Sequence, residues 1–138
     1  MSPRNTRTGG VLEAMVLPAL KQGGYTYETQ VNLGQRLGLG RHFVDAVAQK
    51  DEQRLLISVK WQQVSGTAEQ KVPFEVICLL EAVEAGNCTK AYVVLGGEGW
   101  TLRKFYTSGG LVKYLNHSGK VELVTLEAFV ARANDGKL

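Results

Sequence analysis

The continuous apolar run KAYVVLG, at residues 90–96, constrains the fold of this chain more than any other segment. A strand whose successive side chains are all apolar has no face for water, so it must lie inside a sheet with cover on both sides. Segments with alternating or mostly apolar side chains predict further strands at residues 25–33, 42–49, 54–61 and 120–126. KAYVVLG therefore predicts a central sheet that is shielded by other elements.

Helical spacing of apolar residues supplies that cover. The order along the chain is helix, three strands, helix, strand, helix, strand, helix, which predicts an α/β fold with a mixed central sheet and helices on both faces. The predicted helices occupy residues 11–24, 66–87, 102–119 and 127–133.

Helix-stop and helix-break residues refine these predictions. Thr67 and Gln70 have the spacing of a capping box at the start of the second helix. Pro18 predicts a kink in the first helix, and Pro73 predicts a kink or a later start in the second. Gly109–Gly110 predict an interruption of the third helix.

Composition bounds the broad class of the protein. A chain of 138 residues with 44% hydrophobic and 21% charged residues is expected to form one domain over residues 1–138, with residues 1–10 flexible. No apolar run is long enough to span a bilayer and no signal peptide is visible, so we expect a cytoplasmic location and no membrane partner. Cys78 and Cys88 lack metal-ligand spacing and are expected to be reduced, buried thiols.

Two charged side chains lie within predicted strands. Asp45 interrupts HFVDAVA, and a carboxylate among apolar neighbours is costly unless it binds a positive group. Lys60 ends the run LLISVK and shares a face with Ser58. Alternation puts Asp45 on one face with Phe43 and Val47, and puts on the other face His42, Val44, Ala46 and Ala48. A tight turn at KDEQ would bring Asp45 and Lys60 together on neighbouring strands.

This arrangement resembles the PD-(D/E)xK nuclease superfamily, which has a restriction endonuclease-like core. The resemblance is carried by Glu13 of the first predicted helix, Asp45 of HFVDAVA and Lys60 of LLISVK, and it covers residues 4–96. The order of elements continues to match as far as residue 125. The opening RNTRTGGVLEAMVLPALKQGGY also resembles that of the archaeal Holliday-junction resolvases, in which a basic segment precedes a glutamate-bearing helix.

The resemblance implies a metal-dependent phosphodiesterase acting on DNA. Carboxylates would hold Mg²⁺, with Mn²⁺ as a substitute and no small-molecule cofactor, and the metal would polarise the scissile phosphate and activate water. The lysine would orient the water and offset the charge that builds on phosphorus. A homodimer or higher homo-oligomer is expected, because one small domain has a single site and a duplex has two strands.

Ser58 departs from the family pattern, which has an acidic residue two positions before the lysine. A hydroxyl is a poor Mg²⁺ ligand beside a carboxylate. Some restriction enzymes of the superfamily carry an SxK variant whose acid lies on the following helix, and Glu75 follows Lys60 by 15 residues. Glu69 is the next candidate. The alternatives are a metal site with fewer acids, or a domain that binds DNA without cutting it.

DNA contacts are predicted in three segments. The stretch QQVSGTAEQK offers Gln62, Ser65, Thr67 and Lys71 at a turn before a helix N-terminus, which suits a phosphate or an ordinary polar turn. The glycine-rich GQRLGLGRH offers Arg36 and Arg41 in a DNA-facing loop or a plain hairpin connection. Lys104 lies in a basic and aromatic helix that suits backbone contacts, as would any amphipathic surface helix.

Three hypotheses of function remain open from the sequence. The first is a Mg²⁺-dependent DNA endonuclease of the restriction or homing type, with Asp45, Glu13 and Glu75 as metal ligands and Lys60 and Gln62 at the attacked phosphate. A resolvase-like, structure-specific nuclease is its closest variant. The second is an inactive nuclease-like DNA-binding module, and the third is an α/β interaction domain with no salt-dependent affinity for DNA.

Overall fold

A five-stranded mixed sheet forms the centre of the computed structural model, which describes residues 6–86 and 88–138. The strands follow one another across the sheet in chain order, and they are β1 (Thr26–Arg36), β2 (Leu39–Lys50), β3 (Gln53–Trp61), β4 (Lys90–Gly96) and β5 (Val121–Thr125). The first three strands pair antiparallel, whereas β3–β4 and β4–β5 pair parallel.

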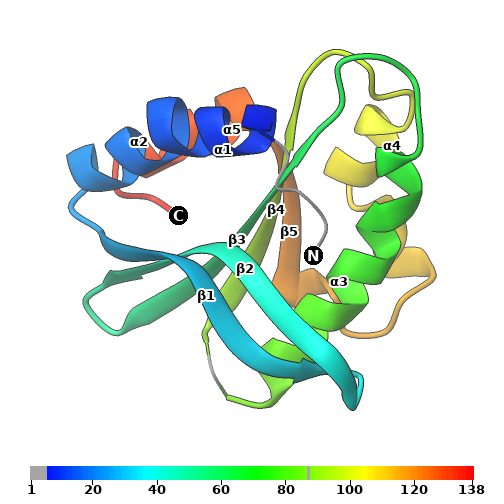
Figure 1. Cartoon of the computed structure of the whole chain (residues 1–138), viewed down its shortest axis with the longest axis horizontal. Coiled ribbons are helices and arrows are strands. Elements are labelled where there is room, and N and C mark those ends of the chain that lie inside the picture. Colours follow the sequence, from blue (N-terminus) through cyan, green and yellow to red (C-terminus); the bar gives the residue numbers. More distant parts are fainter. Residues whose placement is uncertain (1–5, 87) are drawn as a thin grey trace.

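Helices cover both faces of this sheet (Figure 1). They are α1 (Thr6–Val11), a π turn (Leu12–Val16), α2 (Leu17–Gln22), α3 (Ala68–Glu84), α4 (Arg103–Thr107) and α5 (Leu126–Asn134), with short 3₁₀ turns at Gly110–Lys113 and Ser118–Lys120. One layer contains α1, α2 and α5, and the other contains α3 and α4. The predicted α/β fold with a mixed, helix-flanked sheet is therefore confirmed.

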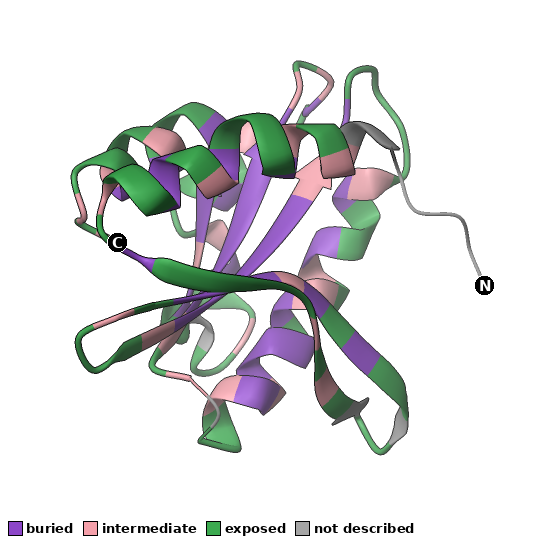
Figure 2. Cartoon of the chain, turned by 60° about the vertical axis from the view of Figure 1, so that its left-hand side comes forward, coloured by how far each residue is buried: buried purple, intermediate pink, exposed green. Residues whose placement is uncertain are grey.

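Two apolar clusters fill the space between the sheet and the two helical layers. One joins Leu12 and Phe129 to Ile57 and Val59 of β3. The other joins Val76 of α3 and its neighbours to the opposite side of β3 and β4. Figure 2 shows the inner strands buried, with the β1–β2 hairpin much more exposed. KAYVVLG is β4, in which all residues after Lys90 are buried, as its apolar run predicts.

The alternation predicted for β2 is wrong at Asp45. Val44 packs with the α3 layer, but Ala46 and Ala48 pack with the α1–α2–α5 layer, although all three have the same parity. The strand therefore turns its faces over at Asp45. A period-two pattern cannot predict such a reversal, because both halves of the strand remain buried.

The first helix also differs from its prediction. Helix begins at Thr6 within the segment expected to be flexible, while residues 1–5 lie outside the described residues. The turn before Pro18 is a π turn, which accommodates a residue that lacks an N–H and crowds the carbonyl four residues earlier.

The predicted capping box at the start of α3 is wrong as well. Thr67 is the N-cap, but its side chain makes no capping hydrogen bond; instead its carbonyl accepts the N–H of Gln70, at 3.1 Å. Pro73 lies inside the helix rather than at its start.

The glycine-rich connection is a hairpin arm. β1 and β2 extend to Arg36 and Leu39, and the tight turn between them uses Leu37 and Gly38, whose φ angles are 52° and 74°. Two central residues with positive φ match the right-handed twist of the strands they join.

Two further expectations concern the thiols and the membrane. Cys78 and Cys88 are both reduced thiols; Cys78 is buried and Cys88 is half-buried. Across residues 6–86 and 88–138, no helix has the length and apolar character needed to cross a membrane.

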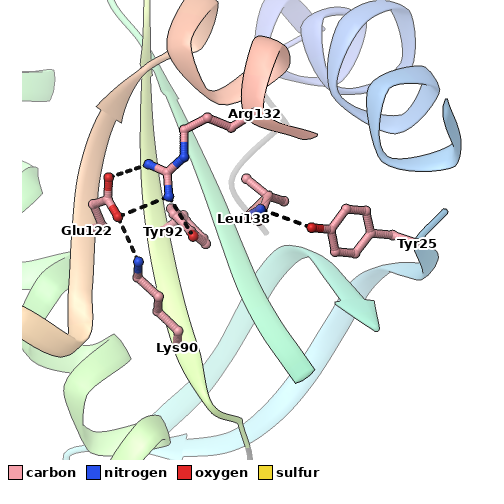
Figure 3. A network of polar contacts seen from close by, with 6 residues as sticks. All are labelled: Tyr25, Lys90, Tyr92, Glu122, Arg132 and Leu138. Atoms are coloured by element: carbon pink, nitrogen blue, oxygen red, sulfur yellow. Dashed lines mark hydrogen bonds and ion pairs between the residues drawn. The ribbon is translucent and has the colours of Figure 1, made fainter. Parts of the chain in front are cut away.

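A polar network ties the C-terminal helix to the edge of the parallel strands (Figure 3). Glu122 of β5 accepts hydrogen bonds from Lys90 of β4, at 2.7 Å, and from Arg132 of α5, at 2.5 Å. Arg132 also lies 3.3 Å from the hydroxyl of Tyr92, whose side chain is fully buried. Burial raises the pKa of the Glu122 carboxyl, but the two cations outweigh it and hold that pKa below its usual 4.5.

We expect Glu122→Gln to lower the free energy of unfolding by about 1 kcal/mol at pH 7, because the amide cannot pair with both cations. Since the folded pKa lies below 4.5, the carboxylate stabilises the fold above that pH, and the stabilisation is lost as the pH falls through the folded pKa. Urea unfolding at pH 7 and pH 3 measures both effects. Glu52→Gln, at an exposed turn position, is the control, and an equal difference at both pH values would contradict the account.

Candidate active site

Asp45 lies where the β2–β3 ladder ends. The paired register runs from Lys50 opposite Gln53 to Ala46 opposite Ile57. One position further, the Asp45 carboxylate accepts the backbone N–H of Val59 at 2.7 Å. The Asp45 side chain thus accepts the Val59 N–H, which has no backbone partner on the described part of β2. The strands β2 and β3 diverge from this point.

The divergence opens a hollow of ≈ 300 Å³ over the C-terminal end of β3. Four regions of the chain contribute to it: α1, the β1–β2 hairpin, β3 and α3. Its lining residues are Thr8, Gln30, Phe43, Asp45, Ser58, Val59, Lys60, Trp61, Ala68, Lys71 and Glu75. Asp45, Lys60 and Glu75, predicted separately as site residues, therefore face one space.

Glu75 joins two of the strands through its carboxylate. Its Oε1 lies 3.1 Å from His42 Nε2 on β2, and its Oε2 lies 3.6 Å from Lys60 Nζ on β3. Because a carboxylate only accepts, Nε2 of His42 carries the hydrogen of this bond. Burial raises the pKa of the Glu75 carboxyl, but the His42 hydrogen bond and the charge of Lys60 outweigh it, so the pKa lies below its usual 4.5. Glu75 is therefore a carboxylate at neutral pH.

Ser58 occupies the position where the family pattern has an acid. It lines the hollow but is only 3% exposed. Glu75 reaches the same space from α3. The structure thus brings to the hollow a carboxylate from the helix that follows β3.

A second acid, Glu69, is used in a different way. Its buried carboxylate accepts from Gln62 Nε2 at 3.1 Å, from the Thr101 hydroxyl at 2.8 Å, and from the backbone N–H groups of Thr101 and Leu102. Burial raises the pKa of the Glu69 carboxyl, but the hydrogen bonds from Thr101, Leu102 and Gln62 together outweigh burial and lower that pKa. Glu69 therefore anchors the first turn of α3 to the loop after β4, and its oxygens do not line the hollow.

The structure corrects the prediction that Gln62 faces the same space as Lys60. Its carboxamide donates to Glu69 and, at 2.7 Å, to the carbonyl of Gly99, and the residue is 5% exposed. The strand β3 ends at Trp61, so the alternation that aligned Gln62 with Lys60 does not extend to it. Gln62 serves the anchor of α3 rather than a phosphate.

Glu13 is also placed away from the hollow. It is exposed on the π turn, because Leu12 and Val16 take the inward directions. Thr8 lines the hollow from this end of the chain instead.

The predicted DNA contacts divide into two groups. Lys71 lines the hollow, and Ser65 and Thr67 are exposed on the turn beside it. Arg41 is exposed on β2 and Lys104 is exposed on α4, and neither lines the hollow. The side chain of Arg36 lies outside the described part of the chain.

Sequence reasoning missed the partners of the predicted residues. His42 is 4% exposed and bonds Glu75. Gln30 and Phe43 line the hollow from β1 and β2. A histidine three positions before Asp45 in a buried strand was the available signal, but its partner is 33 residues away.

Comparison with known proteins gives one family and one fold. A family model described as a PD-(D/E)XK nuclease superfamily domain matches residues 4–137. Among curated proteins, none matches the chain. Among solved structures, the crystal structure of a protein of unknown function, AF1548, is similar with a TM-score of 0.54 and 16% identity over 88% of this chain. The match spans 58% of that protein, and it shows the likeness of fold alone.

We expect Lys60→Met to shift the titration of the Glu75 carboxyl to higher pH, because it removes a cation that opposes the effect of burial. Carboxyl NMR of the labelled glutamates measures the shift. Lys104→Met, on α4, is the matched control. A Glu75 titration that is the same in all three proteins would contradict the ion pair.

Proposed function

Since this chain belongs to the PD-(D/E)XK nuclease superfamily, we propose that it hydrolyses DNA phosphodiester bonds as a metal-dependent endonuclease, with residues 1–138 as a single nuclease-like domain. The observation that carries the proposal is the meeting of Asp45, Lys60 and Glu75 in one open hollow. Asp45 and Glu75 are the proposed acids and Lys60 the proposed catalytic amine.

The donor set of the hollow fits a hard divalent cation. Superfamily members generally use divalent metals, and Mg²⁺ commonly binds one or two carboxylates while keeping water and substrate phosphate as its other ligands. Among the described residues, no group of three His, Cys, Asp or Glu is arranged to hold a metal ion, so a fully protein-made cage is not expected. Asp45 and Glu75 would hold the ion, which supplies Lewis-acid polarisation of the phosphate.

The protein groups have separate roles in this proposal. The Val59 N–H fixes the direction of the Asp45 carboxylate, and the His42 N–H fixes one oxygen of Glu75. Lys60 is 26% exposed, so its ammonium group reaches solvent in the hollow while its charge is held next to Glu75. There it would orient the attacking water and stabilise the negative charge that develops on the phosphate.

The surroundings of the hollow suit a polyanion. Lys71 lies at its wall, and the exposed turn with Ser65 and Thr67 adjoins it. Arg41 on the hairpin and Lys104 on α4 would extend the contact along the DNA backbone. Binding through such groups falls with rising salt.

A site-specific enzyme of the restriction or homing type is the proposed kind of endonuclease, because a carboxylate from the following helix accompanies Ser58 and Lys60. Two copies of the chain would cut the two strands of a duplex. Cleavage confined to branched DNA would instead favour the resolvase-like alternative.

We expect Lys60→Ala and Asp45→Ala each to lower the rate of plasmid cleavage in Mg²⁺ by about a hundredfold or more, because each removes a charge from the reacting centre. Nicking and linearisation of supercoiled plasmid, with branched DNA in parallel, measure the rates. Lys120→Ala, an exposed position outside the hollow, should cut at the wild-type rate. Cleavage that survives both hollow substitutions would sink the assignment.

Comparing the cleavage rates of Glu75 and Ser58 variants tests the role of Glu75. Glu75→Gln keeps the shape of the side chain and should cost about as much as Asp45→Asn, whereas Ser58→Ala should stay within about threefold of wild type. If Ser58→Ala is as damaging as Glu75→Gln, the acid has not moved to α3. A wild-type chain that binds DNA with salt dependence but cuts none would favour the inactive binding module.

A further inference from the structure

Gln30 has a strained backbone in the middle of a regular strand. Its φ angle is 51°, in the left-handed region, within the 11-residue strand β1. For a residue with a Cβ atom this conformation is strained. Strain of this kind persists only where the surrounding structure imposes it.

The position of Gln30 is directly opposite Asp45. Thr29 pairs with Ala46 and Val31 pairs with Val44, so the register passes through Gln30 and Asp45 without a shift. No extra residue is inserted here, and the strained conformation is not the product of a bulge.

The face reversal of β2 lies at this pair. On β2, Val44 packs with the α3 layer and Ala46 with the other layer. On the β1 side, Val31 packs with the α3 layer, whereas Tyr25, at the same parity, packs with the other one. Asp45 is not among the residues with positive φ, so the reversal of β2 does not by itself require a left-handed residue on β1. Glycine would adopt the conformation of Gln30 without a Cβ penalty. The chain has a long carboxamide there instead.

That carboxamide is available for a ligand. Gln30 is exposed and lines the hollow with Asp45 and Lys60. Within the described residues the carboxamide of Gln30 makes no hydrogen bond, whereas the Glu75 carboxylate is already engaged by His42 and Lys60. An amide can donate to a phosphate oxygen, and adjacent strands lie about 4.8 Å apart, so Gln30 lies one strand further from β3 than Asp45 does.

We propose that Gln30 is a substrate-binding residue of the hollow, whose carboxamide donates a hydrogen bond to the DNA phosphate that flanks the scissile one. The proposal rests on the proposed function. In this proposal the strained backbone of β1 positions the Gln30 carboxamide, which holds the DNA strand beside the Asp45 carboxylate.

Gln30→Gly tests this role, because it removes the carboxamide and permits the left-handed backbone. We expect its melting temperature to equal or exceed that of wild type, its KM for cleavable DNA to rise about tenfold, and its kcat to stay within about twofold. The Kd for the same DNA in EDTA should rise by a similar factor. Gln30→Asn, which keeps a carboxamide and tolerates positive φ, should recover most of the affinity.

Asp51→Gly is the matched control, since Asp51 has a φ angle of 55° in the β2–β3 turn and does not line the hollow. It should gain stability without any change in KM. Two results would overturn the role of Gln30 and leave the nuclease proposal standing. One is a Gln30→Gly variant with the KM and Kd of wild type, and the other is a variant in which only kcat falls. A wild-type chain that neither binds nor cuts DNA would overturn both.

Discussion

The hydrogen bond from the Val59 N–H to the Asp45 carboxylate is the contact on which the site depends. It stands where the β2–β3 ladder would otherwise continue, and it leaves the two strands free to separate without exposing an unpaired buried donor. The separation creates the hollow, and the hairpin beyond it turns over to pack on the α3 layer. The Asp45 carboxylate thus lies both at the end of the sheet ladder and at the wall of the hollow.

Charge balance around Glu75 completes the site. A carboxylate that is 12% exposed is costly to ionise, and here His42 and Lys60 offset that cost from two different strands. The hydrogen bonds of Glu69 hold the start of α3 and thereby help to set the position of Glu75 relative to β3. The geometry of the hollow therefore depends on three acids in different places: Asp45 at the ladder end, Glu75 in the hollow, and Glu69 in the helix anchor.

The order of elements and the placement of Asp45 and Lys60 on neighbouring strands could be predicted from the sequence, because they depend on local periodicity and on a tight turn between adjacent strands. Glu75 could be predicted as a site residue only from the resemblance to the SxK variant of the family motif. The role of Gln62 was predicted wrongly, because strand alternation was extended one residue past the end of β3. Neither the face reversal at Asp45 nor the strained Gln30 leaves a trace in hydropathy, since residues on both sides of the reversal remain buried. These features arise from packing between distant segments, which no local pattern encodes.

The central claim is that an acid on α3 replaces the one absent from β3. Anomalous diffraction from a crystal of the chain with DNA and Mn²⁺ tests it most directly. The account predicts a metal peak in contact with the carboxylates of both Asp45 and Glu75, next to a DNA phosphate. A metal held without Glu75, with that side chain still paired only to His42 and Lys60, would contradict it.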